Sequence, residues 1–231
     1  MIESKDCYVF DNCKKHQNGN CPMNEQFCIK LFKLDYLYNE SLLSMQQRKY
    51  LTLRIDADGT DRDEFVKLKH IESNIEEFVK NGNSLYIWSQ HCGNGKTAWS
   101  IRLIQSYFNT IWHKCDLNCK ALFINVPKFL LALKDNISEK NEYIEHIKEN
   151  ILIADLVVWD EIGTKVVTQF EHEHLLSLIN SRIDFNKSQI FTSNLAPQGL
   201  KEAVGERLYS RVINNSIISE FKGLDKRGLE Q

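Results

Sequence analysis

Apolar residues along the chain fall into two patterns. Short, nearly continuous apolar runs bounded by polar residues are typical of strands buried on both faces of a parallel sheet. These runs lie at 85–88, 121–126 and 156–159. Two segments that are more polar, 188–194 with its polar tip and 216–221, are also expected to be strands. Elsewhere, apolar residues recur at helical spacing. The predicted helices are 29–43, 65–79, 98–107, one opened by Pro127, 141–150, 171–183 and 205–211.

Helices and strands therefore alternate through most of the chain, which predicts an α/β fold with a parallel sheet flanked by helices. The length of 231 residues suits one core domain with a small appendage. We expect a small N-terminal domain at 1–45, a linker and connecting helix at 46–77, and the core domain at 78–231.

A phosphate-binding loop is predicted between the first strand and the helix that follows it. The segment Gly-Asn-Gly-Lys-Thr stands there, and loop amides together with a helix N-terminus attract anionic oxygens. Lys96 is expected to reach the terminal phosphates and the Thr97 hydroxyl to bind Mg²⁺. Gln90 occupies the position where the full pattern has glycine. The candidate nucleotide-binding residues of this segment are Gly93, Asn94, Gly95, Lys96, Thr97 and Ala98.

An acidic pair follows the buried run at 156–159. In a phosphate-loop ATPase, Asp160 at this position would order the Mg²⁺ shell and Glu161 would orient or deprotonate the attacking water. The alternative is a strand that ends in a solvated acidic turn. The upstream Gly-Lys-Thr segment favours the catalytic interpretation.

Three polar residues further along could complete the site. Asn194 ends a predicted strand, where ligands of parallel sheets bind, and could position water or contact the terminal phosphate. The alternative is ordinary turn chemistry before Pro197. Arg207 and Arg211 share one helix face and could stabilise phosphoryl transfer. Their alternative is surface pairing with nearby glutamates, Glu202 or Glu206.

Four cysteines near the start suggest a metal site. Cys7, Cys13, Cys21 and Cys28 lie in a polar segment that lacks the apolar residues of an independent core. Four thiolates fit tetrahedral Zn²⁺, and His16 could replace one of them. The alternative is a loosely packed arm with four free thiols.

Several other features are interpreted as structural. Cys115 and Cys119, near His113, are expected to pack in the core, and Cys92 in the phosphate loop is expected to be inert. The run 171–174, Glu-His-Glu-His, lacks the spacing of a zinc protease and predicts a solvated helix face.

Net charge and the length of apolar stretches limit the partners and the cellular location that can be expected. The formal net charge is −2, so DNA binding would need a local basic patch or an assembled oligomer. No apolar stretch is long enough to span a membrane and no apolar signal region opens the chain, so a cytoplasmic protein with reduced cysteines is expected.

Taken together, these motifs resemble the AAA+ ATPases of the DnaC/DnaI helicase-loader family, especially the phage-encoded members. Residues 93–97 resemble Walker A, 157–161 resemble Walker B, 192–194 resemble the sensor-1 strand, and 205–211 resemble the arginine-finger helix. Residues 221–227 resemble the short C-terminal segment of these loaders, with Arg227 in a sensor-2 position and no helical lid after it.

The resemblance implies a function and partners. It implies ATP hydrolysis with Mg²⁺, with Glu161 activating water and Arg211 reaching the nucleotide of a neighbouring subunit. It further implies a zinc-binding N-terminal domain that docks on a DnaB-type hexameric replicative helicase, self-assembly into a ring or spiral, and binding of single-stranded DNA. Such a protein would work in the cytoplasm of a bacterial cell or a phage-infected host.

Three alternatives remain at this point. One is an ATPase that regulates transposition on a similar AAA+ core. The second is a small-molecule kinase with a phosphate loop. The third is a zinc-stapled adaptor that binds nucleotide without hydrolysing it.

Overall fold

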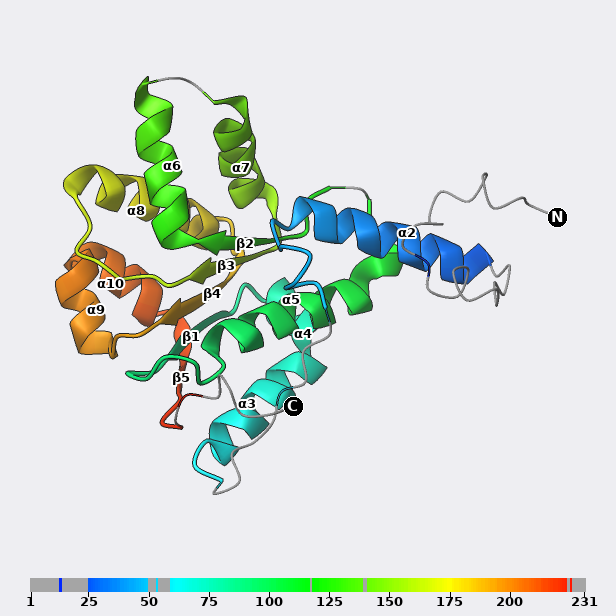
Figure 1. Ribbon diagram of the computed structural model, residues 1–231, viewed down its shortest axis with the longest axis horizontal. Coiled ribbons are helices and arrows are strands. Elements are labelled where there is room, and N and C mark those ends of the chain that lie inside the picture. The colour runs from blue at the N-terminus through cyan, green and yellow to red at the C-terminus, as the bar shows by residue number, and fades with distance from the viewer. Residues whose placement is uncertain are drawn as a thin grey trace.

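A parallel five-stranded sheet forms the centre of the molecule (Figure 1). The computed structural model describes residues 13, 25–49, 53, 59–116, 118–138, 141–223 and 225. The strand order is β2-β3-β4-β1-β5, and each neighbouring pair is parallel. The strands are β1 Ser84–Trp88, β2 Ala121–Asn125, β3 Leu156–Asp160, β4 Ser188–Ser193 and β5 Ser216–Glu220.

Helices cover both faces of this sheet. They are α2 Glu25–Glu40, α3 Arg62–Ser73, α4 Ile75–Lys80, α5 Lys96–Ile111, α6 Val126–Ser138, α7 Glu142–Ile153, α8 Gln169–Asp184, α9 Pro197–Val204 and α10 Glu206–Ile213, with a short 3₁₀ turn at Trp112–Lys114. Figure 1 shows the pair α6 and α7 projecting beyond the sheet.

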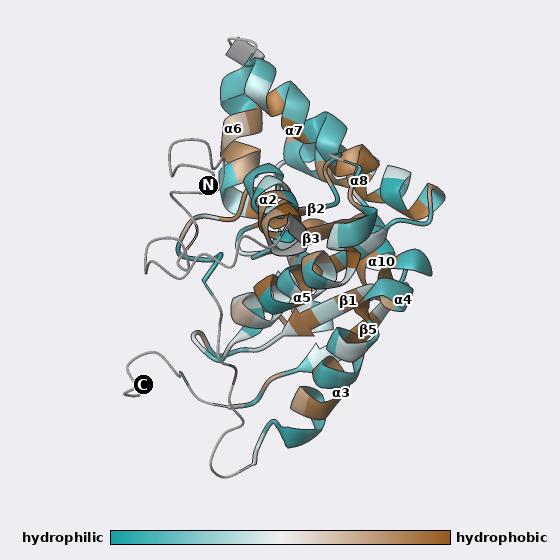
Figure 2. Cartoon of the chain, turned by 90° about the vertical axis from the view of Figure 1, so that its right-hand side faces the viewer, coloured by the Kyte–Doolittle hydropathy of each residue, from teal (hydrophilic) through white to brown (hydrophobic). Residues whose placement is uncertain are grey.

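Alternating strand residues supply two separate cores. Leu85 and Ile87 of β1 pack with buried residues of α2, α3, α4 and α5 on one face. Tyr86 and Trp88 pack with residues of α6, α7, α8, α9 and α10 on the other. Because both faces are covered, β1, β2 and β3 are mostly apolar and buried, as their continuous runs predicted. Strand β4 is buried but carries four polar residues, and β5 at the edge of the sheet is partly exposed. Figure 2 shows hydrophobic residues gathered in the strands and on the inner sides of the helices.

The predicted helix at 65–79 is wrong as a single element. The structure divides it into α3 and α4 at Asn74, whose φ is −117°. The Asn74 side chain donates a hydrogen bond of 2.9 Å to the carbonyl of His70, so it competes with the regular backbone pattern. Helix α9 was not predicted, although Pro197 occupies its first turn.

The solvated face predicted at 171–174 is wrong for Glu171. Its side chain is fully buried and forms a capping box with Thr168 at the start of α8. Lys134 and Lys165 approach its carboxylate at 3.0 and 2.8 Å. Glu173 on the same helix is exposed, as expected.

Cys115 and Cys119 are buried, as the packing interpretation predicted. The Cys119 thiol contacts the backbone carbonyls of Glu40 and Ala121, both at 3.8 Å. Burial raises the pKa of this thiol to about 12, so it stays protonated and inert at neutral pH.

The predicted zinc site falls largely outside the described residues. Cys7, Cys21 and His16 lie there, whereas Cys13 is buried and Cys28 is half-buried. Within the described ranges, no group of three or more His, Cys, Asp and Glu side chains could hold a metal ion. The four-cysteine site therefore stays a prediction.

None of the helices in the described part of the chain is both long and apolar enough to cross a lipid bilayer.

Candidate nucleotide-binding site

The predicted phosphate loop, acidic pair and Asn194 lie at the carboxyl edge of the sheet. Because neighbouring strands are parallel, the segments that follow β1, β3 and β4 emerge on the same side. They carry the phosphate loop, the acidic pair and Asn194 respectively. This is the edge at which open α/β sheets bind ligands.

Backbone conformation and polar contacts shape the phosphate loop between β1 and α5. Gly93 and Gly95 adopt φ values of +74° and +102°, which side chains with a Cβ rarely tolerate. The Ser89 hydroxyl accepts a 3.1 Å hydrogen bond from the His91 amide and another from the Asn94 side chain. The loop is thereby tied to the end of β1.

The Lys96 ammonium lies within this loop. It donates hydrogen bonds to the carbonyl of His91 at 2.8 Å and to Oδ1 of Asn94 at 3.2 Å. Lys96 also begins α5, whose first turn carries no acidic residue, so the helix N-terminus adds positive potential. Gln90 and Cys92 are exposed on the loop.

The two residues predicted to bind Mg²⁺ are in direct contact. Thr97 Oγ1 donates to Oδ1 of Asp160 at 2.9 Å, although the residues are 63 positions apart. Thr192 Oγ1 donates to the same oxygen at 2.7 Å. Burial raises the pKa of the Asp160 carboxyl, and these two hydrogen bonds partly oppose that effect. A hydroxyl beside a carboxylate is an oxygen ligand set that fits Mg²⁺.

Glu161 is held in an unusual conformation beside this pair. Its φ is +63°, a region that non-glycine residues seldom occupy and that is enriched at functional sites. The Thr192 hydroxyl accepts a hydrogen bond of 3.0 Å from the Glu161 amide. The side chain is exposed and accepts a 3.1 Å hydrogen bond from Nδ2 of Asn125.

Sequence reasoning missed Asn125 and Thr192. Asn125 ends β2 and lies in register with Asp160 of β3, so its amide reaches the neighbouring Glu161. The available signal was a polar residue at the carboxyl end of a predicted strand. Thr192 gave a weaker signal, because a threonine is common inside strands.

Asn194, Arg207 and Arg211 are exposed. No hydrogen bond joins these side chains to the phosphate loop within the described residues. Glu206 pairs with Lys201 at 2.9 Å, and the described ion pairs include neither arginine, so the predicted surface pairing with Glu202 or Glu206 is not formed. Arg227 lies outside the described residues.

The segment after β5 approaches the phosphate loop at Asp225. The buried Asp61 carboxylate fixes its start by accepting hydrogen bonds from the amides of Lys222 and Gly223, at 2.8 and 3.0 Å. Further along, a Cβ built on Gly93 would collide with the carboxylate of Asp225. A negative charge therefore lies directly against the loop that would bind phosphates.

We expect Asp225→Asn to strengthen nucleotide binding about 3-fold, because it removes a repulsive charge that solvent only partly screens. Titration with a fluorescent ATP analogue measures the Kd. Glu202→Gln, on exposed α9 surface, is the control for a change of net charge. Equal dissociation constants for Asp225→Asn and wild type would contradict this role of Asp225.

Comparisons with known proteins agree with this geometry. The family model described as the bacterial DnaA ATPase domain matches residues 68–218, more than half of the chain. The replicative helicase loader DnaC of Buchnera aphidicola subsp. Schizaphis graminum is 28% identical over 172 residues. This match covers 73% of the chain and 65% of the relative, so the chain spans just under two thirds of the relative's length.

Solved structures share the fold. The crystal structure of the DnaC helicase loader superposes with a TM-score of 0.60 at 15% identity, covering 80% of this chain and 98% of the other. The crystal structure of DnaI gives 0.61 at 16% identity, covering 81% and 95%. The transposition and kinase alternatives gain no support from these matches.

The family match at residues 68–218 covers the whole sheet up to β5, the phosphate loop and the contact between Thr97 and Asp160. The observed geometry and the sequence match therefore agree. The predicted resemblance to the DnaC/DnaI helicase loaders is confirmed, and the chain belongs to the family of the bacterial DnaA ATPase domain.

Proposed function

We propose that this protein is an ATP-dependent loader of a replicative helicase. The observation that carries the proposal is the cluster at the carboxyl edge of the sheet. There, Thr97 and Asp160 share a hydrogen bond, and Asn125 holds the neighbouring Glu161. A binding protein that never hydrolyses nucleotide has no need of a strained glutamate beside its magnesium ligands.

Each residue of the cluster has a distinct role in the proposed hydrolysis. Lys96 and the loop amides would bind the phosphates of ATP. Thr97 and Asp160 would hold Mg²⁺, which would neutralise charge on the phosphates. Glu161 orients the attacking water and accepts its proton. Asn125 is a positioning residue, and Asn194 contributes a polar group near the terminal phosphate.

A neighbouring subunit would complete the site. Arg211 projects from α10 with no ion-pair partner among the described residues, so its guanidinium is available to another chain. Arg207 is one helical turn away on the same face, and Arg227 is a further candidate for phosphate contact. An arginine supplied by a neighbour raises phosphoryl-transfer rates by about 10³–10⁵ in systems of this type. Hydrolysis would then depend on assembly into a ring or spiral.

The partners follow from the same proposal. The N-terminal unit, with Zn²⁺ bound by Cys7, Cys13, Cys21 and Cys28, docks on a DnaB-type hexameric helicase in the cytoplasm. The assembled ATPase domains engage single-stranded DNA during replication initiation. With a net charge of −2, DNA binding should be modest and sensitive to salt.

ATP hydrolysis measured with and without the cognate helicase and single-stranded DNA tests the proposal. We expect the wild-type rate to rise when both are added and the rate of Arg211→Ala to fall by about 10³ under those conditions, with ATP binding unchanged. Lys201→Ala, which removes a partly exposed cation from α9, should behave as wild type.

Two outcomes would contradict the proposal. A wild-type rate that is indifferent to helicase and DNA would argue against a loader. A rate that rises normally in Arg211→Ala would remove this arginine from the site and leave the rest of the cluster intact.

A further inference from the structure

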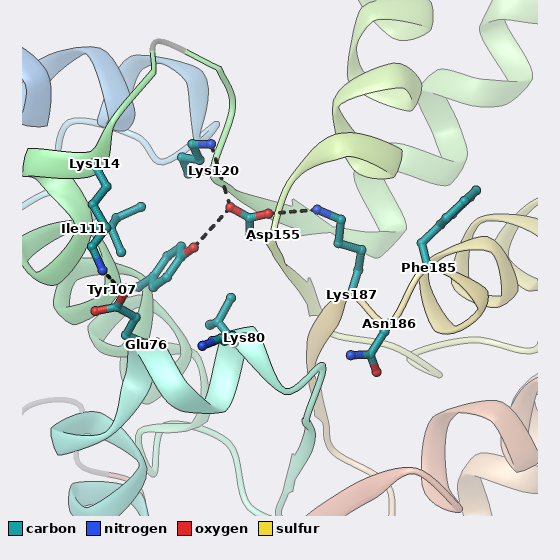
Figure 3. A pocket seen from close by; sticks show the side chains of 11 residues that line it. Glu76, Lys80, Tyr107, Ile111, Lys114, Lys120, Asp155, Phe185, Asn186 and Lys187 are labelled. Atoms are coloured by element: carbon teal, nitrogen blue, oxygen red, sulfur yellow. Dashed lines mark hydrogen bonds and ion pairs between the residues drawn. The ribbon is translucent and has the colours of Figure 1, made fainter.

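A cavity lies at the amino edge of the sheet, opposite the edge that carries the phosphate loop. Its volume is about 430 Å³, and the residues that precede three strands line it: Lys120 before β2, Asp155 before β3 and Lys187 before β4 (Figure 3). A five-residue strand spans about 16 Å, so this cavity is separate from the phosphate loop. We call it the amino-edge pocket.

Cations outnumber carboxylates in the amino-edge pocket. Four lysines line it, namely Lys80, Lys114, Lys120 and Lys187, against Glu76 and Asp155. Both carboxylates are already engaged: Glu76 by Lys114, and Asp155 by Lys187 at 2.8 Å, by the Tyr107 hydroxyl at 3.2 Å and by Lys120 at 4.0 Å. The positive charge is therefore only partly compensated.

Lys80 and one cation outside the lining, Arg182, contribute most to this imbalance. Lys80 is exposed and has no ion-pair partner among the described residues. Behind the pocket, the buried Arg182 guanidinium donates a hydrogen bond of 3.4 Å to the carbonyl of Asp155. Among the described ion pairs, one carboxylate from outside the pocket lining neutralises a lining lysine. This is Asp116, which pairs with Lys120 at 2.9 Å. The ammonium of Lys80 is therefore available to an anion in this pocket.

An exposed aromatic side chain also lines the pocket. Phe185 is 69% exposed and is followed directly by Asn186 and Lys187, which also line the pocket. Asn186 adopts a φ of +50° and packs against Gly82, so the turn before β4 is held against the turn before β1. Val79 and Ile111 add apolar lining. Lysines beside an exposed ring are the combination that binds a phosphate and stacks a base.

We propose that the amino-edge pocket binds a nucleotide unit, with its phosphate on Lys80 and Lys187 and its base on Phe185. The unit would come either from a strand of single-stranded DNA or from a free nucleotide, since both offer the same phosphate and ring. The volume lies in the usual range for small-ligand sites. This site is independent of the phosphate loop and of the ATPase activity proposed for it.

The test uses the full chain with a saturating non-hydrolysable ATP analogue, so that the phosphate loop is occupied throughout. Fluorescence anisotropy follows binding of labelled dT12, and equilibrium dialysis follows dTMP. The variant is Lys80→Ala/Phe185→Ala, whose side chains are both exposed, so the fold is retained. The matched control is Lys201→Ala/Val166→Ala, which removes one lysine and one exposed apolar side chain elsewhere.

We expect the double variant to bind dT12 roughly 10-fold more weakly, with a smaller salt dependence, while the control binds as wild type. A parallel loss of dTMP binding would show that free nucleotide also enters, whereas loss confined to dT12 would identify the strand as the ligand. Wild-type protein that binds neither probe, or a double variant that matches its control with both, would overturn the proposal. Affinity for the ATP analogue, measured in the same variants, reports separately on the phosphate loop.

Discussion

Replacing Glu161 by glutamine is expected to lower the rate of ATP hydrolysis by about 10²–10⁴ while leaving ATP binding intact. Glutamine preserves the shape of the side chain and can still accept the hydrogen bond that Asn125 donates to Glu161 at 3.1 Å. It has no carboxylate to accept the proton of the attacking water. Steady-state phosphate release, measured with helicase and single-stranded DNA present, gives the rate.

Two companion variants make this result specific. Glu173→Gln removes an exposed carboxylate from α8 and should hydrolyse ATP as wild type does. Asn125→Ala leaves the Glu161 carboxylate in place but unsupported, so its kcat should fall less than that of Glu161→Gln, with KM for ATP little changed. Full activity in Glu161→Gln would assign the proton transfer to another group.

Replacing Arg182 by methionine is expected to lower the free energy of unfolding by about 3–5 kcal/mol. The guanidinium is fully buried and donates hydrogen bonds to the carbonyls of Ile151, Ala154, Asp155 and Ser188. These carbonyls end α7 and flank the starts of β3 and β4. Methionine would fill the volume but leave the carbonyls without a donor.

Urea denaturation followed by circular dichroism measures this change. Arg182→Lys keeps the charge but lacks the forked donor, so its loss of stability should be smaller than that of Arg182→Met. Arg62→Met, on the exposed surface at the start of α3, should change the unfolding free energy by less than about 0.5 kcal/mol. A similarly small loss in Arg182→Met would mean that water satisfies these carbonyls.

The strands and the phosphate loop were predictable because their signals are local. Continuous apolar runs marked β1, β2 and β3, and a Gly-Lys-Thr segment between a strand and a helix marked the loop. The pairing of Thr97 with Asp160 followed as well, since parallel strands must deliver their carboxyl ends to one edge. The roles of Arg211 and of the four N-terminal cysteines remain predictions, because each depends on a neighbour or a metal.

The tertiary structure alone decided which polar groups meet. The register of β2 against β3 aligns Asn125 with Asp160, which places the side-chain amide of Asn125 beside Glu161. The position of β4 between β3 and β1 brings the Thr192 hydroxyl to Asp160. Contacts of this kind join residues far apart in the sequence, and hydrophobic periodicity carries no information about register or strand order. The burial of Glu171, the approach of Asp225 to Gly93 and the lysines of the amino-edge pocket have the same origin. The sequence by itself determined the elements and the chemistry of the phosphate loop, whereas packing determined the partners that orient that chemistry.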